Sequence, residues 1–313
     1  MLSRTADHLF WMSRYMERAE NVARMLDVNY RMSLLPQDPQ SIERQWRAAL
    51  DAMGLLGQYE ATGGAYQPQE VMRFMVLERN NPSSIYSCLR SARENAHAVR
   101  GTLTSELWET TNSTWIAMRS FDETGLDGDG AGEFFEWVKF RSHLSRGVTV
   151  GTMLRDEALH FIRLGTFLER ADSTARLLDV KFHELSSVEK QDAAAEYYQW
   201  SALLRSVSAF EIFRKVYRDS ITPTRVADLL ILNRGMPRSL SGCMDEVYGL
   251  LQGVANQRSS ETERRAGELA AELRFGRIED ILQYGLHDWL TQFIERVADL
   301  GNRISNDFLV PVS

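Results

Sequence analysis

The chain has 313 residues, 44% of them hydrophobic and 25% charged, which is ordinary globular usage and argues against intrinsic disorder. A net charge of -7 argues against a general binder of nucleic-acid backbones, and two cysteines are too few for a disulfide framework or a thiolate zinc site. An ordinary membrane span is excluded because no run of about 18 apolar residues lacks charges. Residues 1–15 contain no signal-peptide core, so we expect a cytoplasmic protein.

Helical periodicity begins at once. Apolar residues at steps of three and four predict a long helix over about 8–30, which the proline-rich stretch 35–39 ends. Asn81-Pro82 is typical of an N-cap followed by proline in the first turn, and predicts the start of a helix that continues to Arg100. Other helices of this part are predicted over 41–56 and 105–119. The Gly- and Asp-rich stretch 122–132 predicts a flexible loop.

The same periodicity continues after this loop. Thr222-Pro223 repeats the cap-then-proline pattern, and Gly235-Met236-Pro237 ends the helix that it begins. The remaining predicted helices cover 133–146, 153–184, 193–218, 239–255, 261–275 and 285–307. Alternating β-branched runs, which would predict strands, do not occur. We therefore predict an all-α multi-helix bundle. It forms one domain over 1–313, with possible halves 1–120 and 133–313 joined by the Gly/Asp-rich loop.

The chain also contains an internal repeat. Residues 8–30 align without gaps onto residues 160–182 at a constant offset of 152, and nine of the 23 aligned positions are identical. Two unrelated amphipathic helices would share an apolar stripe, but they would not readily share Glu-Arg, a later Arg and an Asp in one register. We therefore predict two pseudo-equivalent long helices, packed about an approximate two-fold axis.

Charged residues of the repeat define a candidate polar site. At about 100° per residue, Glu17, Glu20 and Arg24 fall within about 60° of one another, away from the apolar face. The second copy repeats this stripe, and the arginine that follows each Glu-Arg glutamate is expected to project to a different side. If the stripes face each other, they form a paired site able to hold ammonium and carboxylate groups. The candidate residues are Glu17, Arg18, Glu20, Arg24, Glu169, Arg170, Asp172 and Arg176.

Two simpler interpretations stay open for the charged segments. The stripes can be solvated faces with the i,i+4 pairs Glu20–Arg24 and Asp172–Arg176, each worth about 0.3–0.5 kcal/mol. A second polar segment follows Asn81 and can form a pocket with Trp108 as one wall, or an exposed salt-bridged helix pair. The candidate residues of this second pocket are Arg93, Glu94, Asn95, Arg100, Trp108 and Asn112.

Catalytic and metal-binding motifs are weak. Glu94 and His97, and again Glu157 and His160, have the Glu-x-x-His spacing of di-metal helical bundles. Helices rich in glutamate contain this spacing by chance, so we favour no metal site and expect no cofactor. The chain has no Gly-x-Ser-x-Gly, no Walker A loop and no Gly-x-Gly-x-x-Gly after a strand, so hydrolase and nucleotide-binding motifs are missing.

Several segments together resemble a known family. Residues 2–4 and 14–20 are similar to the opening signature of the bacterial alpha-E domain family, and residues 81–84 and 92–96 to its middle signature. Residues 155–156, 164–165, 168–172 and 176 are similar to its third signature, and residues 237–239 to a later one, in the same order. The resemblance implies an all-helical protein associated with circularly permuted ATP-grasp ligases, transglutaminase-like proteins and sometimes a proteasome-like peptidase. His97 stands where this resemblance leads us to expect arginine, which weakens the metal interpretation.

Two functional hypotheses follow. In the first, the protein is an accessory module of an ATP-grasp-type peptide or amide ligase, with possible transglutaminase-like or peptidase partners and with no nucleic-acid or membrane partner. Its acidic residues would hold amines, and its arginines would hold carboxylates or phosphates. In the second, the protein is an enzyme in its own right, using paired carboxylates as general acid and base or a Glu-x-x-His di-metal site.

Overall fold

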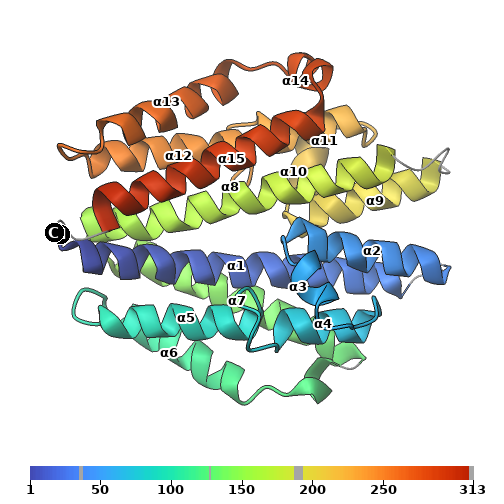
Figure 1. Cartoon of the computed structure of the whole chain (residues 1–313), viewed down its shortest axis with the longest axis horizontal. Helices are drawn as coiled ribbons and strands as arrows, with labels where there is room; N and C mark the ends of the chain where they lie inside the picture. Colours follow the sequence, from blue (N-terminus) through green and yellow to red (C-terminus); the bar gives the residue numbers. More distant parts are fainter. Residues whose placement is uncertain (35–37, 127, 187–192, 310–313) are drawn as a thin grey trace.

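A computed structural model describes residues 1–34, 38–126, 128–186 and 193–309. These residues form fifteen α-helices and no strand, so the all-α prediction is confirmed (Figure 1). The first half contains α1 (Ser3–Ser33), α2 (Pro39–Ala52), α3 (Leu56–Glu60), α4 (Pro68–Val76), α5 (Ile85–Ala98), α6 (Ser105–Arg119) and α7 (Asp129–Thr152). The second half contains α8 (Glu157–Ser186), α9 (Ala193–Ser206), α10 (Phe210–Tyr217), α11 (Pro223–Ile231), α12 (Leu240–Gly253), α13 (Ser260–Phe275), α14 (Ile278–Tyr284) and α15 (Leu286–Ile304).

The two halves repeat the same order of helices. α1 and α8 have 31 and 30 residues, and α4 and α11 have nine each. α2 and α9, like α5 and α12, have 14 residues each. The sequence carries a second repeat here, outside the one predicted: residues 67–89 align onto 222–244 at a constant offset of 155, and Pro, Val, Leu, Arg, Pro, Ser and Cys recur in register. The duplication therefore extends well beyond the two long helices.

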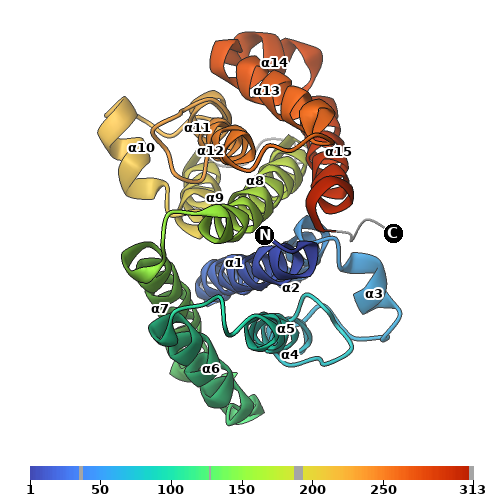
Figure 2. The ribbon, with the colours of Figure 1, turned by 90° about the vertical axis from the view of Figure 1, so that its left-hand side faces the viewer.

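The long helices α1 and α8 lie side by side at the centre (Figure 2). α5 and α7 pack on α1, and α12 and α15 pack on α8 in the matching way. The second helix of each half crosses over, because α2 packs on α8 and α9 packs on α1. This exchange is what an approximate two-fold axis between the long helices produces, and it interlocks the halves.

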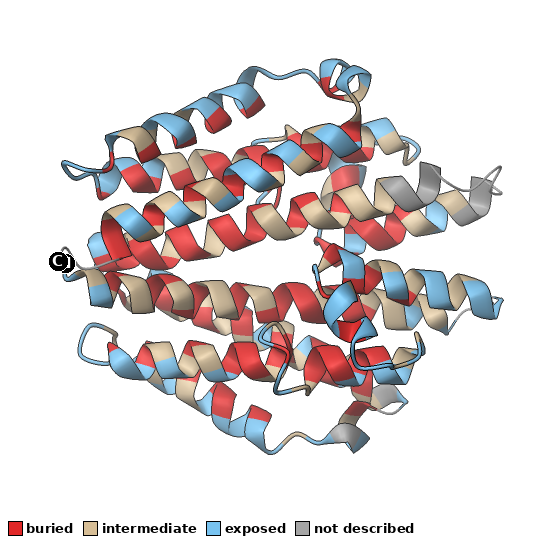
Figure 3. Ribbon diagram, in the orientation of Figure 1, coloured by how far each residue is buried: buried red, intermediate tan, exposed pale blue. Residues whose placement is uncertain are grey.

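Helix α1 belongs to two hydrophobic cores. Its residues Ala6 to Met12 pack into the core of the second half, whereas Met16 to Leu26 pack into the core of the first half. Buried residues consequently run along most of α1 (Figure 3). The predicted division of the halves at residues 121–132 needs correction, since Phe134 and Phe135 of α7 lie in the core of the first half. The repeat boundary lies after α7.

Close packing of the two long helices depends on Gly165. A Cβ atom at this position would lie 2.3 Å from the backbone oxygen of Phe10 and 2.3 Å from Oγ of Ser13. Only glycine leaves room for the backbones to approach this closely. The sequence position matching Gly165 in the first repeat is Ser13, so the contact joins equivalent points of the two helices.

Several helix boundaries differ from the predictions. α5 begins at Ile85, because Ser84 rather than Asn81 is the N-cap and accepts from the backbone N–H of Ser87 at 3.1 Å. Asn81 instead accepts from the N–H of Ser83 at 2.9 Å, in a turn that precedes the helix. The helix predicted over 193–218 is broken between α9 and α10, where Ser208 adopts a left-handed φ of 55°. The short helices α3, α4 and α14 were not predicted.

The loop prediction for 122–132 is only partly right. A single 3-10 turn covers Glu123–Leu126, and α7 begins at Asp129 instead of residue 133. The prediction over 105–119 matches α6. None of the described helices combines the length and the apolar character that crossing a membrane requires.

Candidate functional site: a buried arginine–glutamate network

The two Glu-Arg pairs of the repeat bind each other across the interface of the long helices. Nε and Nη2 of Arg18 donate to the two carboxylate oxygens of Glu169 at 2.5 and 3.0 Å. In the reverse direction, Nε and Nη2 of Arg170 donate to Glu17 at 2.8 and 3.0 Å. Both contacts are bidentate, the geometry that the planar guanidinium group favours. Arg18 and Arg170 were expected to project to a different side from the stripes; their side chains reach the glutamate of the opposite helix, a pairing that the sequence did not predict.

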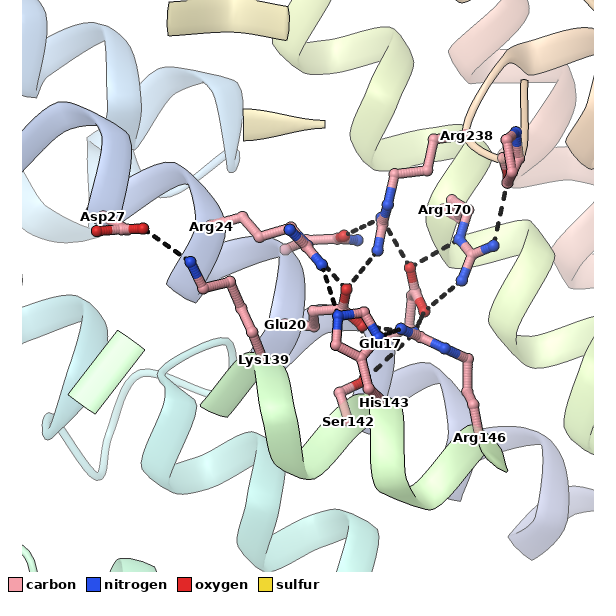
Figure 4. A network of polar contacts seen from close by, with 12 residues as sticks. Glu17, Glu20, Arg24, Asp27, Lys139, Ser142, His143, Arg146, Arg170 and Arg238 are labelled. Carbon is pink, nitrogen blue, oxygen red and sulfur yellow. Dashed lines mark hydrogen bonds and ion pairs between the residues drawn. The ribbon is translucent and has the colours of Figure 1, made fainter. Parts of the chain in front are cut away.

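Two more arginines extend the network on the side of Glu20 (Figure 4). Arg238, in the loop before α12, donates to Glu17 at 2.9 Å and to Glu20 at 2.6 Å. Arg146 of α7 donates to the same glutamates at 2.8 and 2.5 Å. Glu20 also accepts from Arg24 at 2.7 Å. Glu17 and Glu20 are 1% and 0% exposed, so this stripe is not a solvated face.

The other end of the network is centred on Glu169. Arg14, one turn before Arg18, donates to Oε2 of Glu169 at 2.8 Å. Arg18 also reaches Ser83 at 3.5 Å, in the loop before α5. On the opposite side Arg170 donates to the backbone oxygen of Pro237 at 3.3 Å. The loops that precede α5 and α12 therefore contact equivalent arginines, as the duplication predicts.

The arginines keep the buried carboxylates ionised. Burial would raise the pKa of Glu17, but Arg170 and Arg238 lower it to about 2. Burial opposes ionisation of Glu20 as well, but Arg238 and Arg146 hold its pKa well below 4.5. Glu169 follows the same pattern with Arg14 and Arg18, which lower its pKa. A general acid or base works best with a pKa near the operating pH, so these three carboxylates are poorly suited to proton transfer.

The acidic stripe of the second repeat differs from that of the first. Asp172 accepts from Arg176 at 2.9 Å, and the two side chains are 23% and 37% exposed. This i,i+4 pair fits the simpler interpretation of a solvated helix face. The predicted stripes consequently do not form two equal sides of one site; the Glu-Arg pairs meet instead.

One edge of the network reaches the surface between α1 and α7. Nη2 of Arg24 lies 3.0 Å from Nε2 of His143, and Nη2 of Arg146 lies 2.7 Å from Nδ1 of the same ring (Figure 4). His143 is exposed, and the two arginine side chains are 11% and 29% exposed. Partial desolvation of the ring, helped by the charges of Arg146 and Arg24, lowers the pKa of His143 below 6.5. We call Arg24, His143 and Arg146 the arginine–histidine edge.

Sequence reasoning missed half of the network. Of the missed residues, Arg14 and Arg238 lie in segments that carry the family resemblance, and Asn21 lies in the aligned repeat 8–30. The α7 residues come from a stretch without a recognised match, so nothing in their order pointed to α1. The missed residues are Arg14, Asn21, Ser142, His143, Arg146 and Arg238.

The second predicted pocket is only partly assembled. The guanidinium groups of Arg93 and Arg100 lie 5.4 and 5.2 Å from the centre of the Trp108 ring, and Arg93 also donates to Asn112 at 3.2 Å. Glu94 is exposed and pairs with Arg93. Asn95 points elsewhere, because its Oδ1 lies 2.8 Å from Nδ1 of His8 on α1. The cluster is a cation–aromatic contact on the α5–α6 surface.

The Glu-x-x-His residues are engaged separately. The ring of His97 packs against Trp108, and that of His160 lies against Gly253. Glu157 pairs with the N-terminal ammonium group of Met1 at 2.5 Å. Within residues 1–34, 38–126, 128–186 and 193–309, no group of three or more potential ligands from His, Cys, Asp and Glu is positioned to hold a metal ion.

A separate cavity of about 660 Å³ lies beyond the network, where the C-terminal parts of α1 and α8 meet α2 and α9. Its walls include equivalent residues of the two repeats, such as Met25 and Leu177, or Gln45 and Gln199. None of the residues of the arginine–histidine edge lines it. No sequence pattern predicted this cavity.

Comparisons with known proteins place these features in a family. The model of the Alpha-E family, described as a predicted alpha-helical domain with a conserved ER motif, matches residues 1–309. Uncharacterized proteins of Mycobacterium tuberculosis and Mycobacterium bovis are 24% identical over 316 residues, covering 95% of this chain and 35% of theirs. The chain thus spans about a third of the length of these relatives. No solved structure matches. The chain has a Glu-Arg dipeptide in each of its two central helices, Glu17-Arg18 and Glu169-Arg170.

Proposed function

We propose that this chain, which belongs to the Alpha-E family, is an accessory protein of an ATP-grasp-type ligase that acts in peptide synthesis or modification in the cytoplasm. Transglutaminase-like or peptidase proteins are further partners in this proposal. The ligase itself is suggested by the family resemblance of the sequence. The contacts within the described residues bear on whether the protein is an accessory or a catalyst.

The accessory role is supported by the central carboxylates, whose hydrogen-bonding positions are already taken by arginines. Glu17, Glu20 and Glu169 each accept from at least two arginines, and all three are buried. Such carboxylates stay ionised and have no room for a substrate amine, so they hold helices together rather than transfer protons. We therefore assign the Glu-Arg pairs an architectural role and do not retain amine binding for these glutamates.

The mycobacterial relatives add a second argument. Because the aligned region is about a third of their length, the same kind of helical unit is joined there to much additional polypeptide. A helical unit that acts together with another protein can also be joined to additional domains in one chain. The stand-alone enzyme, by contrast, is favoured by no contact among the described residues.

The test is to co-express this chain with an ATP-grasp protein from a neighbouring gene. Size-exclusion chromatography measures whether the two form a complex, and release of ADP with a mixture of amino acids measures ligase activity. We expect co-elution, a change in the rate of ADP release, or both. Independent elution together with an unchanged rate would overturn the proposal.

A matched pair of variants separates docking from folding. Tyr198 is 55% exposed on α9, and Phe275 is 78% exposed at the end of α13, so neither holds the core. Replacing each by serine in turn should leave the fold intact and probes the surfaces of α9 and α13 separately. We expect at most one of the two to reduce co-elution, since a docking surface is local.

A further inference from the structure

The arginine–glutamate network carries more positive than negative charge. Six arginines share three buried glutamates, so the nine side chains sum to +3. Within the described part of the chain, no other carboxylate forms an ion pair with these arginines. Excess charge in a poorly solvated region is costly unless a counter-charge approaches it. The excess is largest around Glu17 and Glu20, which are shared by Arg24, Arg146, Arg170 and Arg238.

The arginine–histidine edge is also short of hydrogen-bond acceptors. Arginine has donors only, and a neutral imidazole has one donor and one acceptor. Both ring nitrogens of His143 face an arginine Nη2, at 3.0 and 2.7 Å, so one of the two contacts places an N–H against an N–H. Protonation of the ring would make both contacts unfavourable. The imidazole therefore lies where a group with two hydrogen-bond acceptors, one for each arginine Nη2, would fit better.

Nearby, Asn21 adds another unmet donor. Its Oδ1 accepts from Arg238 at 2.8 Å, while its buried Nδ2 has no hydrogen-bond partner in the parts of the chain that the structure describes. Buried donors without a partner are uncommon in native proteins. The network consequently lacks acceptors at more than one point.

Arg24 and Arg146 are held in place by buried groups on the side away from His143. Nε of Arg24 donates to Glu20, and Nη1 of Arg146 donates to Glu17, Glu20 and Ser142. The Nη2 atoms that face His143 are therefore fixed without help from the histidine. His143 is exposed, so its side chain can rotate towards solvent while the arginines stay in position.

From this geometry we propose that the arginine–histidine edge is a binding site for a small oxyanion, a carboxylate or phosphate group, which displaces the His143 ring and accepts from both Arg24 and Arg146. Oxygen atoms of such a group are acceptors only, so both Nη2 donors are satisfied. Its charge also offsets the excess of the network. The site does not depend on the ligase partnership, because it is formed by this chain alone.

The experiment uses the isolated full chain with histidine rings labelled for NMR. Inorganic phosphate and acetate are titrated separately at pH 7.5, with ionic strength held constant by chloride. We expect a saturable shift of the His143 ring signals by at least one anion, while those of His8 and His160 stay unchanged. The two arms distinguish a phosphate from a carboxylate ligand. Absence of any saturable shift of His143 with both anions would overturn the proposal.

Variants at equivalent positions of the repeat provide the control. Arg24→Gln should weaken anion binding about tenfold or more, the loss of one charge-assisted contact. Arg176→Gln changes the equivalent arginine of α8, which pairs with Asp172 and contacts no histidine in the described structure, so it should bind as the parent does. Equal affinities of the two variants would overturn the proposal.

His143→Ala keeps the proposal falsifiable if Arg24→Gln fails to fold. The exposed ring can be removed without disturbing the buried contacts, and the anion then has no side chain to displace. Calorimetry should show tighter binding than in the parent chain. Unchanged or weaker binding would overturn the assignment of His143 as the group that occupies the site.

Discussion

Glu20 and Asp172 occupy equivalent positions of the repeat but lie in different surroundings. Glu20 is fully buried and accepts from Arg24, Arg146 and Arg238. Asp172 is partly exposed and pairs with Arg176 alone. An isolated buried charge costs several kcal/mol, whereas an exposed ion pair contributes a fraction of one. Glu20 and Asp172 should therefore contribute very different amounts to the free energy of unfolding.

Glu20→Gln should lower the free energy of unfolding by about 3–5 kcal/mol, because it leaves buried arginines without their counter-charge. Asp172→Asn, the matched control, should cost about 0.5 kcal/mol or less. Urea denaturation of both variants at pH 7 measures the two values. Losses of similar size would contradict the contrast in burial.

The difference in stability between the parent chain and Glu20→Gln should also depend on pH. The pKa of Glu20 is lower in the folded chain than its ordinary value of 4.5, so its stabilising contribution is present above that value. It is lost progressively as the pH falls below 4.5, because the unfolded chain then binds the proton more readily. Denaturation curves of the parent and of Glu20→Gln should therefore converge in acid.

The close crossing of α1 and α8 depends on a single glycine, Gly165. A Cβ atom at Gly165 would overlap the backbone of α1, whereas one at Gly249 of α12 would meet no atom outside its own stretch of helix within 4 Å. Gly165→Ala should therefore destabilise the fold by about 1–3 kcal/mol, the usual cost of overpacking. Gly249→Ala should be neutral or stabilising by up to about 1 kcal/mol, since alanine favours the helix.

Thermal unfolding followed by circular dichroism compares these two glycine variants. The parent chain gives the reference, and the helical content of the folded variants should be the same. A Gly165→Ala protein as stable as Gly249→Ala would show that the helices can separate at little cost.

The N-caps show how well local sequence predicts where a helix begins. Thr222 was predicted as an N-cap and is one, since it accepts from the N–H of Arg225 at 3.4 Å. Asn81 has an equally good capping side chain, but Ser84 takes that role and Asn81 forms a turn. Capping preferences do not distinguish these two residues. Contacts of Asn81 with Phe74, seven residues earlier, decide between them.

Both halves depend on each other because α1 serves two cores. Expressed alone, a fragment of residues 1–153 would expose Ala6 to Met12 and leave Glu17 without Arg170 and Arg238. A fragment of residues 154–313 would lose the helix on which α9 and α8 pack. Each half therefore buries part of its apolar surface and its central charges only against the other half.

We expect neither fragment to unfold cooperatively by itself, and the two together to form a complex with a cooperative transition. Co-expression followed by size-exclusion chromatography and thermal unfolding measures this. The control is a second fragment that carries Gly165→Leu, which should not assemble because leucine cannot fit against α1. A cooperatively folded fragment of residues 1–153 would contradict the interlocked arrangement.

The sequence by itself determined the helical class and the duplication of the long helices, and it singled out the two Glu-Arg pairs as candidate site residues. These follow from periodicity and register, which are properties of neighbouring residues along the chain. Tertiary structure alone decided that Arg18 and Arg170 bind the opposite glutamates, that Arg146 and Arg238 complete the network, and that one acidic stripe is buried while its copy is partly exposed. The physical reason is that burial and charge pairing depend on which helices pack together. Residues separated by more than a hundred positions decide that outcome here.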